Sequence, residues 1–436
     1  MTETTLPDAD QSPLRIANFR AYWFSRLSMT LAQYAMMLII GWQTYNIARD
    51  GGMGVGAASG QLALIGLLQF VPLFLLTPFS GWAADHFDRR NIARLTVLAQ
   101  LGCAATLAWL TTSNNLTLPT LFSVAVVLGI VRAFNGPALS ALAPNLVPKT
   151  ILPNAIALSS IAWQVGMIVG PAIGGYTYAI FPALPYFVAL GLFACSLIAL
   201  SFIGRVPQPP REANRRPIHQ MVEGLRYVVR NKMVLGAITL DLFAVFLAGA
   251  TALFPVYARD ILEVGETGLA QLAMAPAVGA ALTALWFSIR PLKTNVGPKM
   301  LLAVAVFGLA TIIFGLSQSM PLSLAMLFIV GAADMFSVYI RQSLIQLHTP
   351  DDKRGRVSSV SLLTISASNE FGDFFSGSLA FLLGPVLAVV GGGVGAIVTV
   401  ALWAKIFPVL RTTRTFDPPE ELLDTPPEQK LQEQMP

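Results

Sequence analysis

Residues 81–95 read GWAADHFDRRNIARL, a charged stretch between long apolar runs, and it decides how the chain is organised. Charged residues make up only 12% of the 436 residues and hydrophobic residues 55%. A soluble domain usually contains about twice that share of charge. Apolar stretches long enough to cross a bilayer recur from residue 20 to residue 404, and they are continuous rather than alternating. The sequence therefore predicts an all-α integral membrane protein in which 81–95 links two spans.

Charged and turn-rich breaks divide the apolar part of the chain into twelve expected transmembrane helices. They run over 20–48, 60–82, 92–112, 119–142, 153–178, 184–204, 234–257, 268–289, 300–317, 321–346, 357–381 and 385–404. One long polar stretch separates six helices from six. We therefore expect an N-terminal segment, a six-helix bundle, a linker, a second bundle and a disordered tail, over 1–19, 20–204, 205–233, 234–404 and 405–436. The later part of the linker favours a helix on the membrane surface.

The basic residues are distributed unequally between the two expected sides of the membrane. If the N-terminus is cytoplasmic, that side carries 23 Lys and Arg, and the outer side carries only Arg49 and Arg259. Cytoplasmic loops are enriched in Lys and Arg, so we expect both termini in the cytoplasm. The acidic, polar first 19 residues do not look like a cleaved signal peptide. Because the basic residues are scattered over separate loops, the net charge of +5 does not indicate nucleic-acid binding.

The link between the second and third expected helices carries a spaced set of residues: Gly81, Asp85, Asp88, Arg89 and Arg90. It resembles the loop signature G-x-x-x-D-[RK]-x-G-[RK]-[RK] of the major facilitator superfamily. The resemblance implies two pseudo-symmetric six-helix bundles, with this loop as a cytoplasmic gate. Asp88 stands where the signature has glycine, and the form D-x-F-D-R-R is similar to the branch of enterobactin exporters and secretion-type permeases. The alternative is a positive-inside loop with incidental acids.

Two further motifs resemble those of drug–proton antiporters. RAFNG in the fourth helix, with Arg132 and Asn135, resembles the R-x-x-Q-G motif that the family links to proton transfer. An arginine in the membrane is costly unless it is paired or hydrated, so it either faces the central cavity or ties helices together. GMIVGPAIGG in the fifth helix matches the family's exporter motif G-x-x-x-G-P-x-x-G-G. Its small residues predict close helix packing: Gly166, Gly170, Pro171, Gly174 and Gly175.

Intramembrane carboxyl groups are the candidates for proton coupling, because all three histidines fall in the links. Glu370 and Asp373 are three residues apart on one helix face, where nearby carboxylates tend to share a proton. Asp334 and Arg132 complete the expected coupling set. The alternative is that Glu370 or Asp373 is a static partner of Arg132 or Arg341. Asp241 is expected in the cytoplasmic gate, as a candidate partner of an arginine in 81–95.

Polar and aromatic residues near mid-membrane are the candidates for substrate contacts. They are Gln33, Tyr34, Gln69, Asn135, Gln164, Phe243, Phe246 and Asn369. For any single aromatic residue among them, ordinary packing is the alternative.

Together these features predict a secondary active exporter of the bacterial inner membrane. It would move a small amphipathic molecule, such as a siderophore, metabolite or drug, outward in exchange for protons. Neither a GxxxxGK[ST] phosphate loop nor a nucleophile–base set occurs, and Cys103 and Cys195 lie in apolar runs. We therefore expect no enzyme activity, cofactor or metal, and a monomer whose partners are substrate, protons and lipids. The alternatives are a lysolipid or lipid transporter of the same fold and a non-transporting membrane sensor or scaffold.

Overall fold

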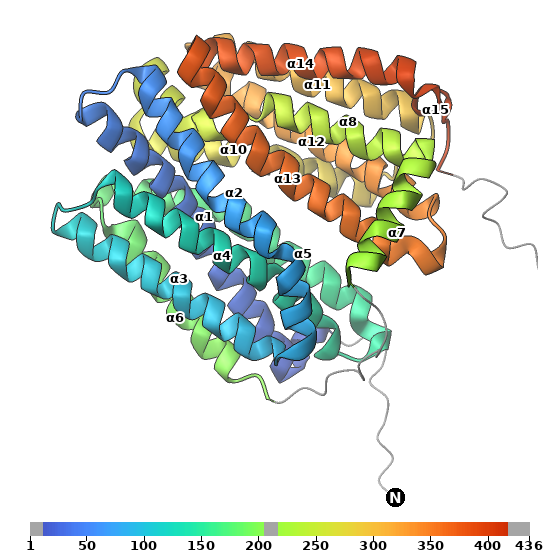
Figure 1. The fold of residues 1–436 in the computed structure, drawn as a ribbon, viewed down its shortest axis with the longest axis horizontal. Helices are drawn as coiled ribbons and strands as arrows, with labels where there is room; N and C mark the ends of the chain where they lie inside the picture. The colour runs from blue at the N-terminus through green and yellow to red at the C-terminus, as the bar shows by residue number, and fades with distance from the viewer. Residues whose placement is uncertain (1–11, 205–216, 417–436) are drawn as a thin grey trace, which may run out of the picture.

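The computed structural model describes residues 12–204 and 217–416, and its described part contains twelve helices of 17 or more residues. The first half holds α1 (Ala17–Asp50), α2 (Val55–His86), α3 (Arg89–Thr112), α4 (Leu118–Leu142), α5 (Leu152–Ile180) and α6 (Leu184–Ser201). The second half holds α8 (Lys232–Ala248), α10 (Gly265–Ile289), α11 (Val296–Leu316), α12 (Met320–Leu347), α13 (Asp351–Leu383) and α14 (Pro385–Ile406). Figure 1 shows the halves as two bundles, drawn from blue to green and from yellow-green to red.

Most of these helices have the length and composition of membrane spans. Ten of the described helical segments are long and apolar enough to cross a bilayer. α1 and α13 fall short of that measure, and in α13 only Phe371–Leu383 stands out as an apolar stretch. The predicted all-α membrane fold is therefore confirmed, with helices that extend a few residues beyond most of the predicted spans.

The seventh predicted span is broken. α8 ends at Ala248, and the chain continues through η4 (Thr251–Leu253), α9 (Phe254–Val256) and η5 (Tyr257–Ile261), a single π-helical turn. Pro255 lies in the short segment after the break, where its missing N–H costs no long helix a hydrogen bond. Tyr257 then donates a hydrogen bond to the carbonyl of Gly315 on α11, at 2.8 Å. This anchor fixes η5, which faces the first half.

The two ends of the molecule differ in what joins the halves. We call the end that holds the α2–α3 link and the end of α6 the linker end, and the opposite end the far end. At the far end one buried cluster contains residues of both halves, including Trp42 and Tyr45 from α1 and Leu269 from α10. Tight packing of this kind holds membrane helices together without a hydrophobic driving force between them. From there the bundles splay apart toward the linker end (Figure 1).

The expected tail is wrong in its first part. α14 runs to Ile406, α15 (Pro408–Thr412) follows, and Leu410 is fully buried. Arg414 donates a hydrogen bond to Asn295 at the start of α11, at 2.8 Å. Packing onto the second bundle therefore orders residues that composition alone assigned to a loose tail. Residues 417–436 lie outside the described residues, as do 1–11 and 205–216. The expected surface helix of the linker is α7 (Pro217–Arg230).

Candidate functional site

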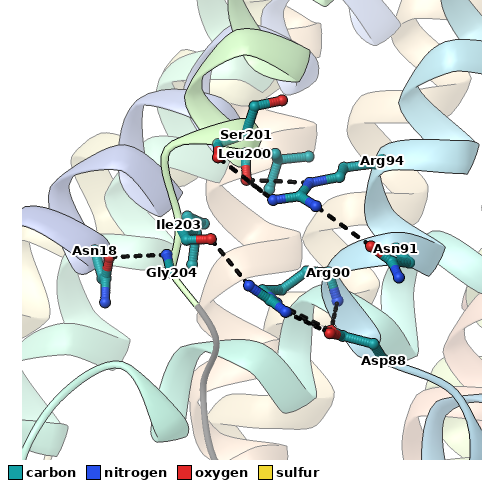
Figure 2. A network of polar contacts seen from close by, with 9 residues as sticks. All are labelled: Asn18, Asp88, Arg90, Asn91, Arg94, Leu200, Ser201, Ile203 and Gly204. Atoms are coloured by element: carbon teal, nitrogen blue, oxygen red, sulfur yellow. Dashed lines mark hydrogen bonds and ion pairs between the residues drawn. The ribbon is translucent and has the colours of Figure 1, made fainter.

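The charged link of residues 81–95 caps α3 and fastens it to α6. The Asp88 carboxylate accepts the backbone N–H of Arg90 at 2.9 Å, as an N-cap residue does. It also accepts the Arg90 guanidinium at 2.5 Å, and this hydrogen bond lowers the pKa of Asp88. Arg90 in turn donates to the carbonyl of Ile203 at 3.1 Å, and Arg94 to that of Leu200 at 2.9 Å (Figure 2).

This network lies within the first half. Asn18 at the start of α1 accepts the N–H of Gly204 at 3.3 Å, so three stretches of the first bundle meet here (Figure 2). Asp88, which stands where the family signature has glycine, thus gains a defined role as helix cap and arginine partner. Arg89 starts α3 beside it. The side-chain surroundings of Gly81 and Asp85 lie outside the described residues.

Three predicted residues of the first half line one hollow. Gln33 from α1, Gln69 from α2 and Arg132 from α4 line a hollow of about 370 Å³, a volume that includes space open to the outside. The Arg132 guanidinium donates to the Gln69 amide oxygen at 3.4 Å. Sequence reasoning missed Gln100 on α3, which also lines this hollow and is 1% exposed. Among the described residues its amide oxygen has no hydrogen-bond partner. We call this site the glutamine hollow; Met36, Met37, Leu128 and Phe193 complete its lining.

The other predicted substrate residues are not among those that line this hollow. Asn135 is buried, and its amide contacts the Met29 sulfur at 3.1 Å and the Thr96 hydroxyl at 3.3 Å. The structure thus places Asn135 in the packing of its own bundle. Gln164 is half-buried on α5, and Asn369 is exposed on α13.

Two of the three predicted aromatic residues pack against other aromatic rings. The ring of Phe243 lies 5.1 Å from that of Trp403 on α14, and the ring of Phe246 lies 4.8 Å from that of Phe375 on α13. Tyr34 lies on α1 opposite the α5 glycines. For Phe243 and Phe246 the structure therefore favours the packing alternative.

The predicted partner of Asp241 is wrong. Its carboxylate forms a buried ion pair with Arg341 on α12, within the second half, and not with an arginine of residues 81–95. The reason is geometric, because α8 and α12 turn these side chains toward each other inside one bundle. Asp334 lines the same hollow of the second half as Asp241.

The pair expected on α13 is only partly described. The Asp373 carboxylate accepts a hydrogen bond from the Thr251 hydroxyl at 2.8 Å, beside the break after α8. The side chain of Glu370 lies outside the described residues. Sharing of a proton between these two carboxyl groups therefore stays a prediction.

The exporter-like motif of α5 packs against both halves. A Cβ at Gly166 or Gly170 would meet side-chain atoms of α1 at 2.4 or 2.6 Å, and one at Gly174 would meet the carbonyl of Ala35 at 2.8 Å. A Cβ at Gly175 would meet Ala270 on α10 at 2.5 Å. Pro171 is buried among them. These distances are too short for a real Cβ atom, so any larger residue would push the helices apart. The glycines therefore set the spacing of α1, α5 and α10.

The far end carries a pair of crossed ion pairs that sequence reasoning missed. Arg49 at the end of α1 contacts Asp260 of η5 at 2.9 Å, and Arg259 contacts Asp50 at 2.6 Å. Tyr45 donates a further hydrogen bond to Asp260. We call Arg49, Asp50, Arg259 and Asp260 the charge clasp. The only sequence signal for it is the Arg-Asp dipeptide that occurs in both halves.

Comparison with known proteins agrees with this architecture. The family profile described as Major Facilitator Superfamily matches residues 21–372. Among curated proteins, the multidrug efflux pump Tap of Mycolicibacterium fortuitum is 26% identical over 76% of this chain and 79% of its own length. The enterobactin exporter EntS of Escherichia coli O1:K1 / APEC is 24% identical over 82% of this chain and 85% of its own length.

Solved structures share the fold at low identity. A bacterial homolog of the human lysosomal transporter Spinster, inward-facing and unoccupied, superposes with a TM-score of 0.66 at 17% identity, over 91% of this chain and 99% of that one. A mutant of the peptide transporter POT reaches a TM-score of 0.70 at 14% identity, over 92% and 99%.

Proposed function

Because the chain belongs to the Major Facilitator Superfamily, we propose that it is a secondary active exporter that exchanges a small amphipathic molecule for protons. The names of two relatives support outward transport: one is a multidrug efflux pump and another is an enterobactin exporter. The α5 glycines support the same direction, because the motif that they form resembles that of exporters. The protein would reside in the bacterial inner membrane as a monomer.

The linker end faces the cytoplasm in this proposal. In the topology expected from the sequence, the side that holds the α2–α3 link carries 23 Lys and Arg in its links and terminal segments, against two on the other side, Arg49 and Arg259. Such a bias sets the orientation of membrane proteins. Since the charge clasp and a buried cluster join the halves at the far end, substrate would enter from the cytoplasm in this conformation. Release outside then requires the clasp to break.

The glutamine hollow is the observation that carries the proposal for substrate binding. Three amide side chains and the Arg132 guanidinium converge there, with Met, Leu and Phe side chains around them. Binding sites for small molecules commonly combine an apolar lining with a few converging polar groups. The arginine and the amides would orient polar groups of the substrate, and the apolar residues would contact its hydrophobic part.

Efflux into everted membrane vesicles tests the proposal. Vesicles that contain the protein are energised, and uptake of ethidium and of enterobactin is measured with and without a protonophore. The proposal predicts uptake of at least one probe that the protonophore abolishes. Gln100→Leu should reduce this uptake, whereas Gly191→Ala, at an α6 position with open space around it, should not. Uptake that is equal with and without the protein would refute export of these molecules.

A further inference from the structure

A second hollow lies inside the second half and contains opposite charges. Asp241 of α8 and Asp334 of α12 line it, and the rest of its lining is apolar except for Ser337. Arg341, seven residues after Asp334 on α12, forms an ion pair with Asp241. The Arg341 side chain is only 3% exposed and that of Asp241 only 7%. We call Asp241, Asp334 and Arg341 the charge triad.

The triad contains one more negative charge than positive charge. The positive charge of the Arg341 guanidinium compensates only one carboxylate, and Asp241 is the carboxylate that pairs with it. Asp334 receives no hydrogen bond among the described residues, and Asp241 and Arg341 are the charged groups close enough to interact with its carboxyl group electrostatically. The described lining residues from α11 are Val304 and Phe307, and α10 contributes none, so no further charge faces Asp334 there. A carboxylate without a compensating positive charge is energetically costly inside a membrane-spanning bundle, and taking up a proton removes the charge and therefore the cost.

Arg341 has unused hydrogen-bonding capacity. Its Nε is buried and has no hydrogen-bond partner among the described residues. A guanidinium can bind a second carboxylate through such a free N–H group. Arg341 could therefore stay with Asp241 while Asp334 is protonated, and contact Asp334 once that proton has left. A buried donor without a partner is unfavourable in a purely structural ion pair.

We propose that the charge triad is the proton-carrying site of the transporter, with Asp334 as the carboxyl group that binds the proton and Asp241 and Arg341 as the pair that controls its charge. This inference rests on the proposed proton exchange and assigns it to Asp334, Asp241 and Arg341 in place of Arg132, Glu370 and Asp373. On loading, the carboxylate of Asp334 gains one proton and the triad becomes neutral. On release, the proton leaves and Arg341 faces two carboxylates.

Infrared spectroscopy of the protein in lipid bilayers tests the proposal without knowledge of the substrate. The signal is the carbonyl band of a protonated carboxylic acid, followed while the pH is raised stepwise. Wild type should show a band that disappears on titration. Asp334→Asn should lose it, because Arg341 already compensates Asp241. Asp241→Asn should lose it too, because Arg341 is then free for Asp334. Asp334→Glu should retain it, which shows that the site still folds.

The control is Asp373→Asn, which removes a carboxyl group of α13 that accepts a hydrogen bond from Thr251. It should retain the titrating band. Loss of the band in this control, or its persistence in Asp334→Asn or Asp241→Asn, overturns the assignment to the triad. Failed efflux with a titrating band refutes the export proposal alone. Proton-dependent efflux that persists in Asp334→Asn refutes this inference alone.

Discussion

Reversing one charge of the clasp should open the far end. In Arg49→Asp, the ion pair with Asp260 is lost and a carboxylate takes the place of the guanidinium. The side chains of Arg49 and Asp260 are 27% and 19% exposed, so the pair lies between an exposed and a buried one. Breaking it should cost about 2 kcal/mol, between the values for exposed and buried pairs. Repulsion between the two carboxylates adds about 1 kcal/mol.

If the state with a closed far end loses about 3 kcal/mol of stability relative to the open state, the ratio of open to closed molecules rises about 100-fold. Spin labels at Ser113 and Gln318, exposed far-end positions in different halves, report this change through their distance distribution. The measurement requires a background without Cys103 and Cys195. Wild type should give one short distance, and Arg49→Asp should add a longer one.

The reciprocal charge swap is the decisive variant. Arg49→Asp combined with Asp260→Arg restores opposite charges and should return the short distance. Arg414→Asp, which removes a hydrogen bond to Asn295 within the second half, should leave the distribution unchanged. If the double variant opens as much as the single one, or if Arg49→Asp changes nothing, the clasp does not hold the halves together.

Three further predictions concern packing, the α2–α3 link and the glutamine hollow. Gly174→Ala should lower stability by about 1–3 kcal/mol, because its Cβ would overlap α1, whereas Gly191→Ala should not; thermal unfolding in detergent checks both. Asp88→Ala should cost about 1 kcal/mol through loss of the helix cap. Because Arg90 lowers the pKa of Asp88 in the folded state, its contribution is present above the ordinary carboxyl value of 3.8 and is lost as pH falls through the lowered value. Unfolding measured against pH should therefore show a smaller acid dependence in Asp88→Asn than in wild type. Gln100→Leu should weaken binding of a transported probe in equilibrium titration and change the free energy of unfolding by less than about 1 kcal/mol, because the amide oxygen it removes has no hydrogen-bond partner among the described residues.

Local patterns in the sequence predict the bundle architecture well. The apolar runs predict the helices, because each span must satisfy its own backbone hydrogen bonds. The glycine spacing at 166, 170 and 174 predicts a packing face, and the structure shows which helix it meets. The position of residues 81–95 follows from the spans on either side.

Contacts between distant helices are harder to predict. The pairing of Asp241 with Arg341 depends on how α8 and α12 are rotated, and the sequence leaves that rotation open. The clasp requires the end of α1 to meet η5, a turn that exists only because the seventh span is broken. Asn135 is buried against Met29, and polarity alone does not show which face of α4 meets a cavity.

Coupled flux is the most direct test of proton-driven export through the charge triad. Purified protein is reconstituted into sealed proteoliposomes, and movements of protons and of a transported probe are recorded together, for wild type and for Asp334→Asn. The account predicts that wild type moves protons and probe in opposite directions, and that Asp334→Asn loses the proton movement and uphill probe transport together. Uphill probe transport by Asp334→Asn with an unchanged proton flux would contradict it.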